Sequence, residues 1–316
     1  MNKINTTIAH KIIKSLNSTS KPNITEISEK ISLSRQTIQN YIDNLREKKI
    51  ISDFTININP NLKPNLIYVV MEIKTNPNEP NLINSLLQIP QLKMLDGIFG
   101  EFSLIALFIC RNTDEFNSIL KKIDTIMSDS YFKKYQFSEP IKIYKTNGIK
   151  LSEIELKEDT IDTIDSTILN ILQSHQASKL ISTYDIKRIL KNKYSIDISQ
   201  STTYNRIKDM EESGIILNYT INFCPQKFGF EGKFIIRIKP KNPSNYDQIA
   251  LNLEKSNEIT HLYRMGSQFG LFAIIRVKTI SNYGDFLKNL YSSGEIEDTF
   301  SNFILDEHVS FTNFSF

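Results

Sequence analysis

Residues that bind metals or form disulfides are scarce in this sequence. Its 316 residues include two cysteines, Cys110 and Cys224, and four histidines that are scattered along the chain. Two cysteines cannot form a disulfide framework or a cysteine-rich zinc site, and no two histidines have the spacing of metal ligands. The sequence also lacks a glycine-rich dinucleotide loop, a Walker loop and a nucleophile elbow. We therefore predict no catalytic residue, no metal and no cofactor.

Long apolar runs are absent as well. No stretch approaches the roughly 18 to 20 apolar residues that span a bilayer. The first 21 residues have polar residues among the apolar ones and lack the apolar core of a signal peptide. We therefore expect a cytoplasmic protein. Hydrophobic residues make up 40% of the chain and charged residues 23%, which is enough apolar material for folded cores.

The sequence contains an internal repeat. Residues 34–58 read SRQTIQNYIDNLREKKIISDFTINI and residues 199–223 read SQSTTYNRIKDMEESGIILNYTINF; 10 of the 25 positions are identical at an offset of 165. The similarity continues from GEFSLIALFI at 100–109 to GSQFGLFAIIRV at 266–277. Because order, spacing and residue type all recur, we interpret the chain as a tandem duplication.

Each half follows the same plan of helices and strands. Helical periodicity opens the half, a second short helix follows, and a third helix begins at Ser34 or Ser199, which are good N-cap residues. A β-branched run comes next, followed by a strand–helix–strand–strand–helix–strand pattern. We expect these elements at about 66–74, 80–89, 93–99, 103–110, 113–127 and 134–145, and again at about 232–239, 245–256, 259–265, 271–277, 281–292 and 297–315.

The second and third helices of each half have the pattern of a helix-turn-helix, whose second helix enters the major groove of DNA. Arginine reads guanine there, and glutamine or asparagine reads adenine. In the first half the exposed face of that helix is predicted to present Arg35, Gln36, Gln39 and Asn40. In the second half it is predicted to present Gln200, Ser201, Tyr204, Asn205 and Lys208, with Arg206 on a flank that could reach a phosphate. These ten residues are the predicted DNA contacts.

Charge differs between the two helical segments. Residues 1–58 carry nine Lys or Arg and five acidic residues, a net charge of +4, whereas residues 161–223 carry seven of each. Neutralisation of phosphates dominates non-specific DNA binding. We therefore predict that the first helix-turn-helix supplies most of the affinity.

At this point the sequence resembles the Lrp/AsnC regulators, also called feast/famine regulatory proteins. IDTIDSTILNIL at 161–172 is similar to the opening pattern of that family, although Ala9 stands in place of its second Asp in the first half. MEESGIILNYTINF at 210–223 is similar to the strand that leaves the DNA-binding domain. The strand–helix–strand–strand–helix–strand portion resembles the family's ligand-sensing domain, a ferredoxin-like sandwich.

The resemblance implies an α+β protein in which two winged helix-turn-helix domains alternate with two ferredoxin-like βαββαβ sandwich domains. The predicted domains are 1–58, 59–146, 161–223 and 224–316, with 147–160 as a linker. Their function would be regulation of transcription on double-stranded DNA. Two copies in one chain would form an intrachain pseudo-dimer, or pair between chains as a homodimer.

The sensing loop of the family is usually Gly-x-aromatic-Asp, and this chain departs from it. A possible small-molecule effector would contact the corresponding loops at Gly100, Phe102 and Ser103 in the first half, and at Gly266, Phe269 and Gly270 in the second. The Asp is absent from both loops. Because a carboxylate is the natural partner of an ammonium group, we expect free amino acids to bind weakly or not at all.

Two other functions fit the same resemblance. Sirohaem decarboxylases look like two Lrp-type chains paired without DNA binding, and His261, Tyr263 and Arg264 lie on the strand where such enzymes carry histidine and basic residues. The simpler expectation is that these residues alternate on a half-buried strand. The third possibility is a co-regulator that binds other proteins through the same fold.

Overall fold

The computed structural model describes residues 6–18, 21–22, 24–62, 66–76, 79–155, 161–174 and 181–315. The chain folds as two compact units, each made of segments that are far apart in sequence. The helical unit comprises Met1–Asn59, Glu153–Phe228 and Phe311–Phe316. The sheet unit comprises Pro60–Ser152 and Gly229–Ser310. Each unit therefore contains material from both halves of the sequence.

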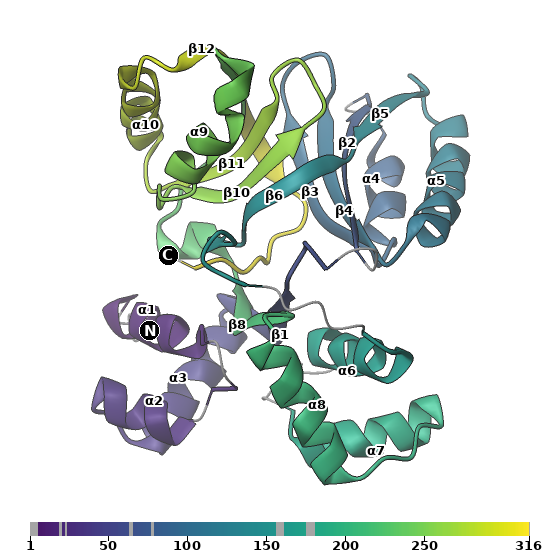
Figure 1. The fold of residues 1–316 in the computed structure, drawn as a ribbon, viewed down its shortest axis with the longest axis vertical. Coiled ribbons are helices and arrows are strands. Elements are labelled where there is room, and N and C mark those ends of the chain that lie inside the picture. Colours follow the sequence, from purple (N-terminus) through teal and green to yellow (C-terminus); the bar gives the residue numbers. More distant parts are fainter. Residues whose placement is uncertain are drawn as a thin grey trace. The chain divides into compact units, whose positions relative to one another are not determined.

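The helical unit contains the same element order twice, namely three helices followed by one strand (Figure 1). The two sets are α1 Thr6–Leu16, α2 Ile24–Ile31, α3 Arg35–Glu47 and β1 Ile51–Ile58, then α6 Thr163–Ser174, α7 Thr183–Tyr194, α8 Gln200–Glu212 and β8 Ile216–Phe223.

Helices α3 and α8 begin where the sequence predicts. The side chain of Ser34 accepts a hydrogen bond from the backbone N–H of Thr37, and Ser199 accepts one from that of Thr202. Each serine thus satisfies one of the N–H groups that a helix start leaves without a partner. The chain leaves α8 through Gly214, whose φ of +74° lies in the left-handed region that favours glycine.

Strands β1 and β8 pair with each other in an antiparallel two-stranded sheet. Thr55 lies opposite Thr220, its counterpart at an offset of 165, so the register is centred on equivalent positions. Two positions further along, Asn57 donates a hydrogen bond to Asn218 at 2.8 Å. Each strand finds its partner in the other half of the sequence. The β-branched run expected after the third helix of each half is therefore a strand, and it pairs across the two halves.

The sheet unit contains one ten-stranded sheet with the strand order β5-β2-β4-β3-β12-β9-β11-β10-β6-β7. Both halves contribute a strand–helix–strand–strand–helix–strand series to it. The first series is β2 Ile67–Lys74, α4 Pro80–Leu87, β3 Leu92–Ile98, β4 Leu104–Cys110, α5 Thr113–Ser128, β5 Lys134–Ser138 and β6 Pro140–Thr146. The second is β9 Gly232–Pro240, α9 Tyr246–Leu253, β10 Ile259–Met265, β11 Leu271–Val277, α10 Ile280–Ser292 and β12 Ile296–Glu307. Short 3-10 helices, Pro225–Phe228 and Pro243–Asn245, precede β9 and α9.

The last strand of each series connects the two halves of the sheet. β5 pairs with β2 of its own half, whereas β6 pairs with β10 of the other half. β12 pairs with β9 as far as Phe303 and with β3 from Ile304 onward. The two series are therefore joined through exchanged strand ends.

Three expected boundaries change. The single strand expected at 134–145 is divided into β5 and β6 at Glu139, next to Pro140, which cannot donate to a ladder. The strand expected at 297–315 ends at Glu307. Within the expected linker 147–160, residues 149–150 form a short strand, β7, on β6, and residues 156–160 lie outside the described part of the chain.

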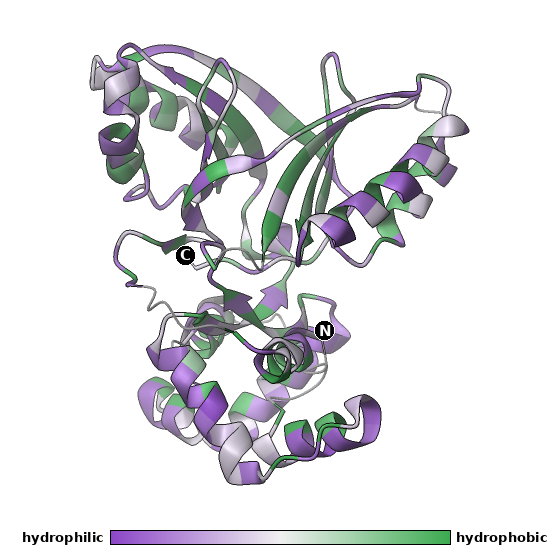
Figure 2. Ribbon diagram, turned by 45° about the vertical axis from the view of Figure 1, so that its right-hand side comes forward, coloured by the Kyte–Doolittle hydropathy of each residue, from purple (hydrophilic) through white to green (hydrophobic). Residues whose placement is uncertain are grey.

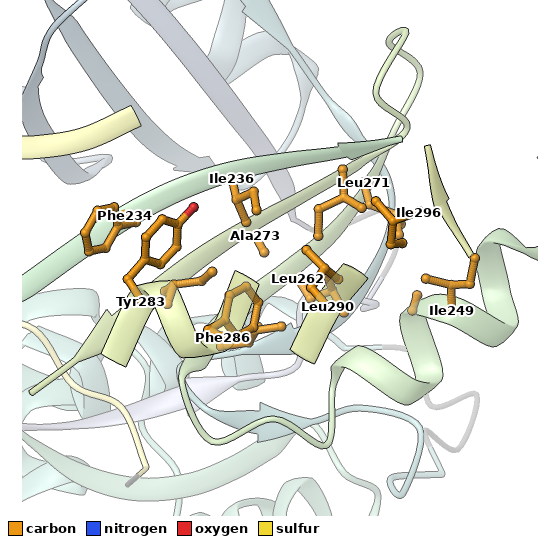
Figure 3. Close-up of a cluster of buried hydrophobic side chains, with 14 of the residues drawn as sticks. Phe234, Ile236, Ile249, Leu262, Leu271, Ala273, Tyr283, Phe286, Leu290 and Ile296 are labelled. Atoms are coloured by element: carbon orange, nitrogen blue, oxygen red, sulfur yellow. The ribbon is translucent and has the colours of Figure 1, made fainter. Parts of the chain in front are cut away.

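Each series packs its helices against one face of its strands, around its own hydrophobic core. Figure 3 shows the core of the second series, where Phe286 and Leu290 of α10 and Ile249 of α9 meet Leu262 and Ala273 of the strands. The core of the first series is built in the same way from β2, β3, β4, α4 and α5. Figure 2 shows hydrophobic and hydrophilic residues interleaved along these helices, as amphipathic helices require.

Candidate nucleic-acid interface

The predicted reading face of α3 lies on the surface of the helical unit. Arg35, Gln36 and Asn40 are exposed, and Gln39 is half-buried. Gln36 donates to the side chain of Asn40 at 2.9 Å, and Gln39 donates to Asp43 at 3.0 Å. A side-chain amide has two donors and two acceptor lone pairs. Both glutamines therefore keep hydrogen-bonding capacity for a ligand such as a base edge.

Helix α8 presents a different set of groups. Its exposed residues are Gln200, Ser201, Tyr204 and Asn205. Tyr204 is one of the more exposed large apolar residues, with 54% of its surface accessible. Gln200 donates to the hydroxyl of Thr183 on α7 at 3.3 Å. Compared with α3, the beginning of α8 offers an aromatic ring and no positive charge.

Arg206 does not lie free on the flank of α8. Its Nη1 is 2.8 Å from a carboxylate oxygen of Asp162, which directly precedes α6, and 2.8 Å from one of Asp165 in the first turn of α6. Although burial opposes it, hydrogen bonds from the Asp165 backbone and from Arg206 lower the pKa of Asp162. The Arg206 guanidinium therefore joins α8 to α6 through Nη1, and its contact with a phosphate stays a prediction.

This contact was not predicted from the sequence, although both acids belong to the motif at 161–172. The first half lacks the whole arrangement. Tyr41 stands at the position of Arg206, and Ala9, which is buried, stands at that of Asp165. A joint loss of the arginine and its acid in one half was the signal that could have revealed it.

The cations of the two helix pairs, α2 with α3 and α7 with α8, differ in their partners. Lys30 and Arg35 near the turn of the first are exposed and form no ion pair with any residue that the structure describes. In the second, Arg188 pairs with Asp185 at 3.2 Å, Lys191 with Asp197 at 2.8 Å and Lys208 with Glu212 at 3.3 Å. The difference in net charge between the halves thus corresponds to a difference in which cations are available to an anion.

The first predicted effector loop uses its polar groups internally. The hydroxyl of Ser103 accepts from the backbone N–H of Thr75 at 3.2 Å and donates to its carbonyl at 3.0 Å. Phe102 is buried beneath the ammonium of Lys134, 5.1 Å from the ring centroid. Glu101 pairs with the same lysine at 2.7 Å, while Gly100 is exposed. The Ser103 hydroxyl is thus engaged within the loop, and the carboxylate of Glu101 is on the surface beside a lysine.

The second predicted effector loop is a tight connection between β10 and β11. The N–H of Gly270 donates to the carbonyl of Ser267 at 3.0 Å, and the φ of Gly270 is +61°. A Cβ at this position would lie 2.3 Å from the ring of Tyr246, so the close approach requires glycine. Phe269 contacts Phe300 with 6.4 Å between ring centroids, and Gly266 is exposed. These contacts explain the loop by packing alone.

His261, Tyr263 and Arg264 alternate across β10, as expected. Arg264 stacks on Tyr246 of α9, with 3.3 Å between the guanidinium carbon and the ring centroid. Tyr263 is buried against the ring of Tyr68, away from the helices. Burial, together with the nearby positive charges of Lys233, Arg276 and Lys145, lowers the pKa of His261 to about 3. The histidine is therefore neutral at physiological pH, and the arginine does not share a face with it.

No group of three or more potential metal ligands occurs among the described residues. Within that same part of the chain, no helix combines the length and apolarity needed to cross a membrane.

Comparison of the sequence with known sequences gives matches that each cover part of the chain. Residues 233–314 match the family described as the Lrp/AsnC ligand binding domain. The HTH-type transcriptional regulator FL11 of Pyrococcus horikoshii is 28% identical over 152 residues, which are 48% of this chain and 94% of that protein. The HTH-type transcriptional regulator Ptr1 of Methanocaldococcus jannaschii is 31% identical over 127 residues, 40% of this chain and 79% of that protein. Each relative thus matches less than half of this chain.

Among solved structures, the sirohaem decarboxylase NirDL resembles the chain over nearly its full length. The TM-score is 0.61, and the alignment covers 94% of this chain and 91% of that chain, at 10% sequence identity. At this identity the likeness shows the fold alone. It shows that a mixed α+β fold of this size has a precedent.

Proposed function

The chain belongs to the Lrp/AsnC family of transcriptional regulators, and on this premise we propose that it binds double-stranded DNA sequence-specifically, with its two halves acting as a pseudo-dimer. The observation that carries the proposal is the pairing of β1 with β8, centred on Thr55 and Thr220. This pairing supports the presence of two recognition helices, α3 and α8, in one compact unit. A homodimer of a conventional regulator needs two chains to supply the same pair of helices.

The repeat supports a tandem duplication as the origin of this arrangement. We propose helix-turn-helix domains at 1–58 and 161–223, and ferredoxin-like domains at 59–146 and 224–316. The segment 147–160 joins the halves, and its beginning extends the first ferredoxin-like domain through β7. The exchanged ends of β6 and β12 support a close pairing of these two domains.

The proposed DNA contacts follow from the exposed groups. On α3 they are Arg35, Gln36, Gln39 and Asn40, which suit guanine and adenine. On α8 they are Gln200, Ser201, Tyr204, Asn205 and Lys208; the Tyr204 ring offers apolar contact to a thymine methyl group. Because the two sets differ, the preferred DNA site is expected to be asymmetric.

The proposal does not include a free amino acid as an effector that binds tightly. The relatives matched by sequence are named transcriptional regulators, and the domain matched at 233–314 is described as ligand binding. In this chain the hydroxyl of Ser103 is bonded to Thr75, and neither the loop at Gly100–Ser103 nor the loop at Gly266–Gly270 contains the Asp of the family's sensing loop. We therefore expect no tight binding of a free amino acid at either loop, and we assign no catalytic residue.

Selection of bound duplexes from a random pool at physiological salt tests the proposal. The expected result is an asymmetric site with two half-sites about one helical turn, or a multiple of it, apart. Arg35→Ala should then cost about 1 to 3 kcal/mol on the selected site and relax the preference at one position. A matched control is Asn44→Ala on the same helix. Failure to enrich any sequence would refute sequence-specific binding.

A further inference from the structure

Four charged side chains are buried together in the sheet unit, where strands of the two halves meet. Asp96 of β3 comes from the first half, and Lys233 of β9, Arg276 of β11 and Glu307 of β12 come from the second. Their side chains are 1, 7, 5 and 9% exposed. Lys233 is ion-paired with Asp96 and lies 3.6 Å from Glu307, and Arg276 donates to both carboxylate oxygens of Glu307. We refer to these four residues as the charged quartet.

The corresponding positions on the other side of the same unit are uncharged. Tyr68 takes on β2 the position that Lys233 takes on β9, and Tyr263 takes on β10 the position that Asp96 takes on β3. Tyr68 and Tyr263 contact each other edge to face, with 6.4 Å between ring centroids. An ion pair on one side of the unit is thus matched by an aromatic pair on the other.

The other two members of the quartet follow the same rule. Glu307 is the ladder partner of Asp96, whereas Ile143 is the ladder partner of Tyr263. Arg276 of β11 corresponds to Ile109 of β4, because β4 and β11 have the same length and place equivalent residues in the two cores. The difference between the sides therefore involves all four positions.

Pairing between two like halves would divide the quartet. If the first half paired with a copy of itself, Asp96 would be buried against Tyr68 in place of Lys233. If the second half paired with a copy of itself, Lys233 would be buried against Tyr263 and would keep only Glu307 of its own half, 3.6 Å away, so one positive charge would lose its compensation. A buried charge without its partner is strongly unfavourable, whereas the aromatic pair alone would favour no particular partner.

We propose that the charged quartet determines partner choice, so that the sheet of the first half accepts the second half and rejects a second copy of itself. Buried polar groups that fix register or partner are the best-attested use of such groups. The proposal rests on the pseudo-dimer described above. It does not depend on DNA binding.

The test uses the full-length chain. An equal mixture of unlabelled and isotope-labelled chains is unfolded in denaturant, refolded at several protein concentrations and weighed by native mass spectrometry. Wild type should return to the mass it had before unfolding. In the double variant Asp96→Leu with Lys233→Met, like halves can pair without burying a lone charge. We expect it to form additional assemblies with at least twice as many chains, labelled and unlabelled together.

The matched control is Tyr68→Phe with Tyr263→Phe, which should keep the wild-type masses. The single variant Lys233→Met should lower Tm by on the order of 10 °C, because Asp96 is left without its cation, and the double variant should recover most of that loss. Wild-type masses for the refolded double variant would overturn the proposal. So would its failure to fold, because the charges would then serve stability and not partner choice. DNA binding by wild type is measured separately and bears on the proposed function alone.

Discussion

Replacing Lys30 and Arg35 together by alanine should weaken DNA binding through lost phosphate contacts. The two side chains are exposed on either side of the turn between α2 and α3, and neither forms an ion pair with a described residue. Each phosphate contact contributes about −0.9 to the slope of log K against log salt concentration. If both cations neutralise a phosphate, the slope becomes shallower by up to about 1.8.

The matched control removes two cations that already have acidic partners. Lys191 lies 2.8 Å from Asp197, and Arg188 lies 3.2 Å from Asp185. Their replacement by alanine changes the net charge by the same amount as the first double variant. Because these two cations must leave an acid to reach a phosphate, the slope should change by less than half as much.

The assay is fluorescence anisotropy of a labelled duplex of arbitrary sequence, titrated at about five salt concentrations between roughly 50 and 200 mM, where phosphate contacts dominate. Arbitrary sequence is sufficient because the phosphate term does not depend on base contacts. Equal slope changes in the two double variants would refute the reasoning, since net charge alone would then account for binding. An unchanged slope in the Lys30 and Arg35 variant would show that these cations of α2 and α3 do not contact the phosphates.

Three further predictions concern stability, measured by thermal and denaturant unfolding. Gly270→Ala should lower the free energy of unfolding by about 1 to 3 kcal/mol, because φ is +61° and the new Cβ meets Tyr246. The control is Gly284→Ala within α10, where a Cβ meets nothing within 4 Å. It should leave the free energy of unfolding unchanged or raise it by up to about 1 kcal/mol. Ser199→Ala should cost about 1 kcal/mol by removing the N-cap of α8. Arg206→Ala should destabilise by about 1 kcal/mol after allowance for solvent screening. The pKa of the partner Asp162 is lowered in the folded protein. The loss of stability caused by Arg206→Ala should therefore be largest above pH 3.8, the ordinary pKa of an aspartate, and should shrink as the pH falls below that value. A loss of stability that grows on acidification would contradict the ion-pair assignment.

Local patterns predicted the single elements well. Ser34 and Ser199 cap their helices as expected, because a serine before a periodic apolar run satisfies backbone N–H groups within one turn. The strands at 271–277 and 259–265 have the expected bounds, since alternation of apolar residues is a local property. The alternation of His261 with Arg264 followed from the same period.

Contacts between residues that are far apart in the sequence could not be predicted from local patterns. Residues 134–145 form two strands because β5 pairs with β2 of the first half and β6 pairs with β10 of the second half. The engagement of Arg206 depends on acids about 40 residues earlier in the chain. Helical periodicity identifies a side chain as exposed, but it does not identify the group that meets it there.

The most direct test of the account is a hydroxyl-radical footprint of the full chain on its selected duplex. If α3 and α8 of one chain read a single asymmetric site, the protein should protect two stretches whose centres are about one helical turn apart. Arg35→Ala should weaken one stretch more than the other, and Tyr204→Ala should do the reverse. A single protected stretch, or equal loss of both stretches in each variant, would contradict the claim that the two halves read DNA together.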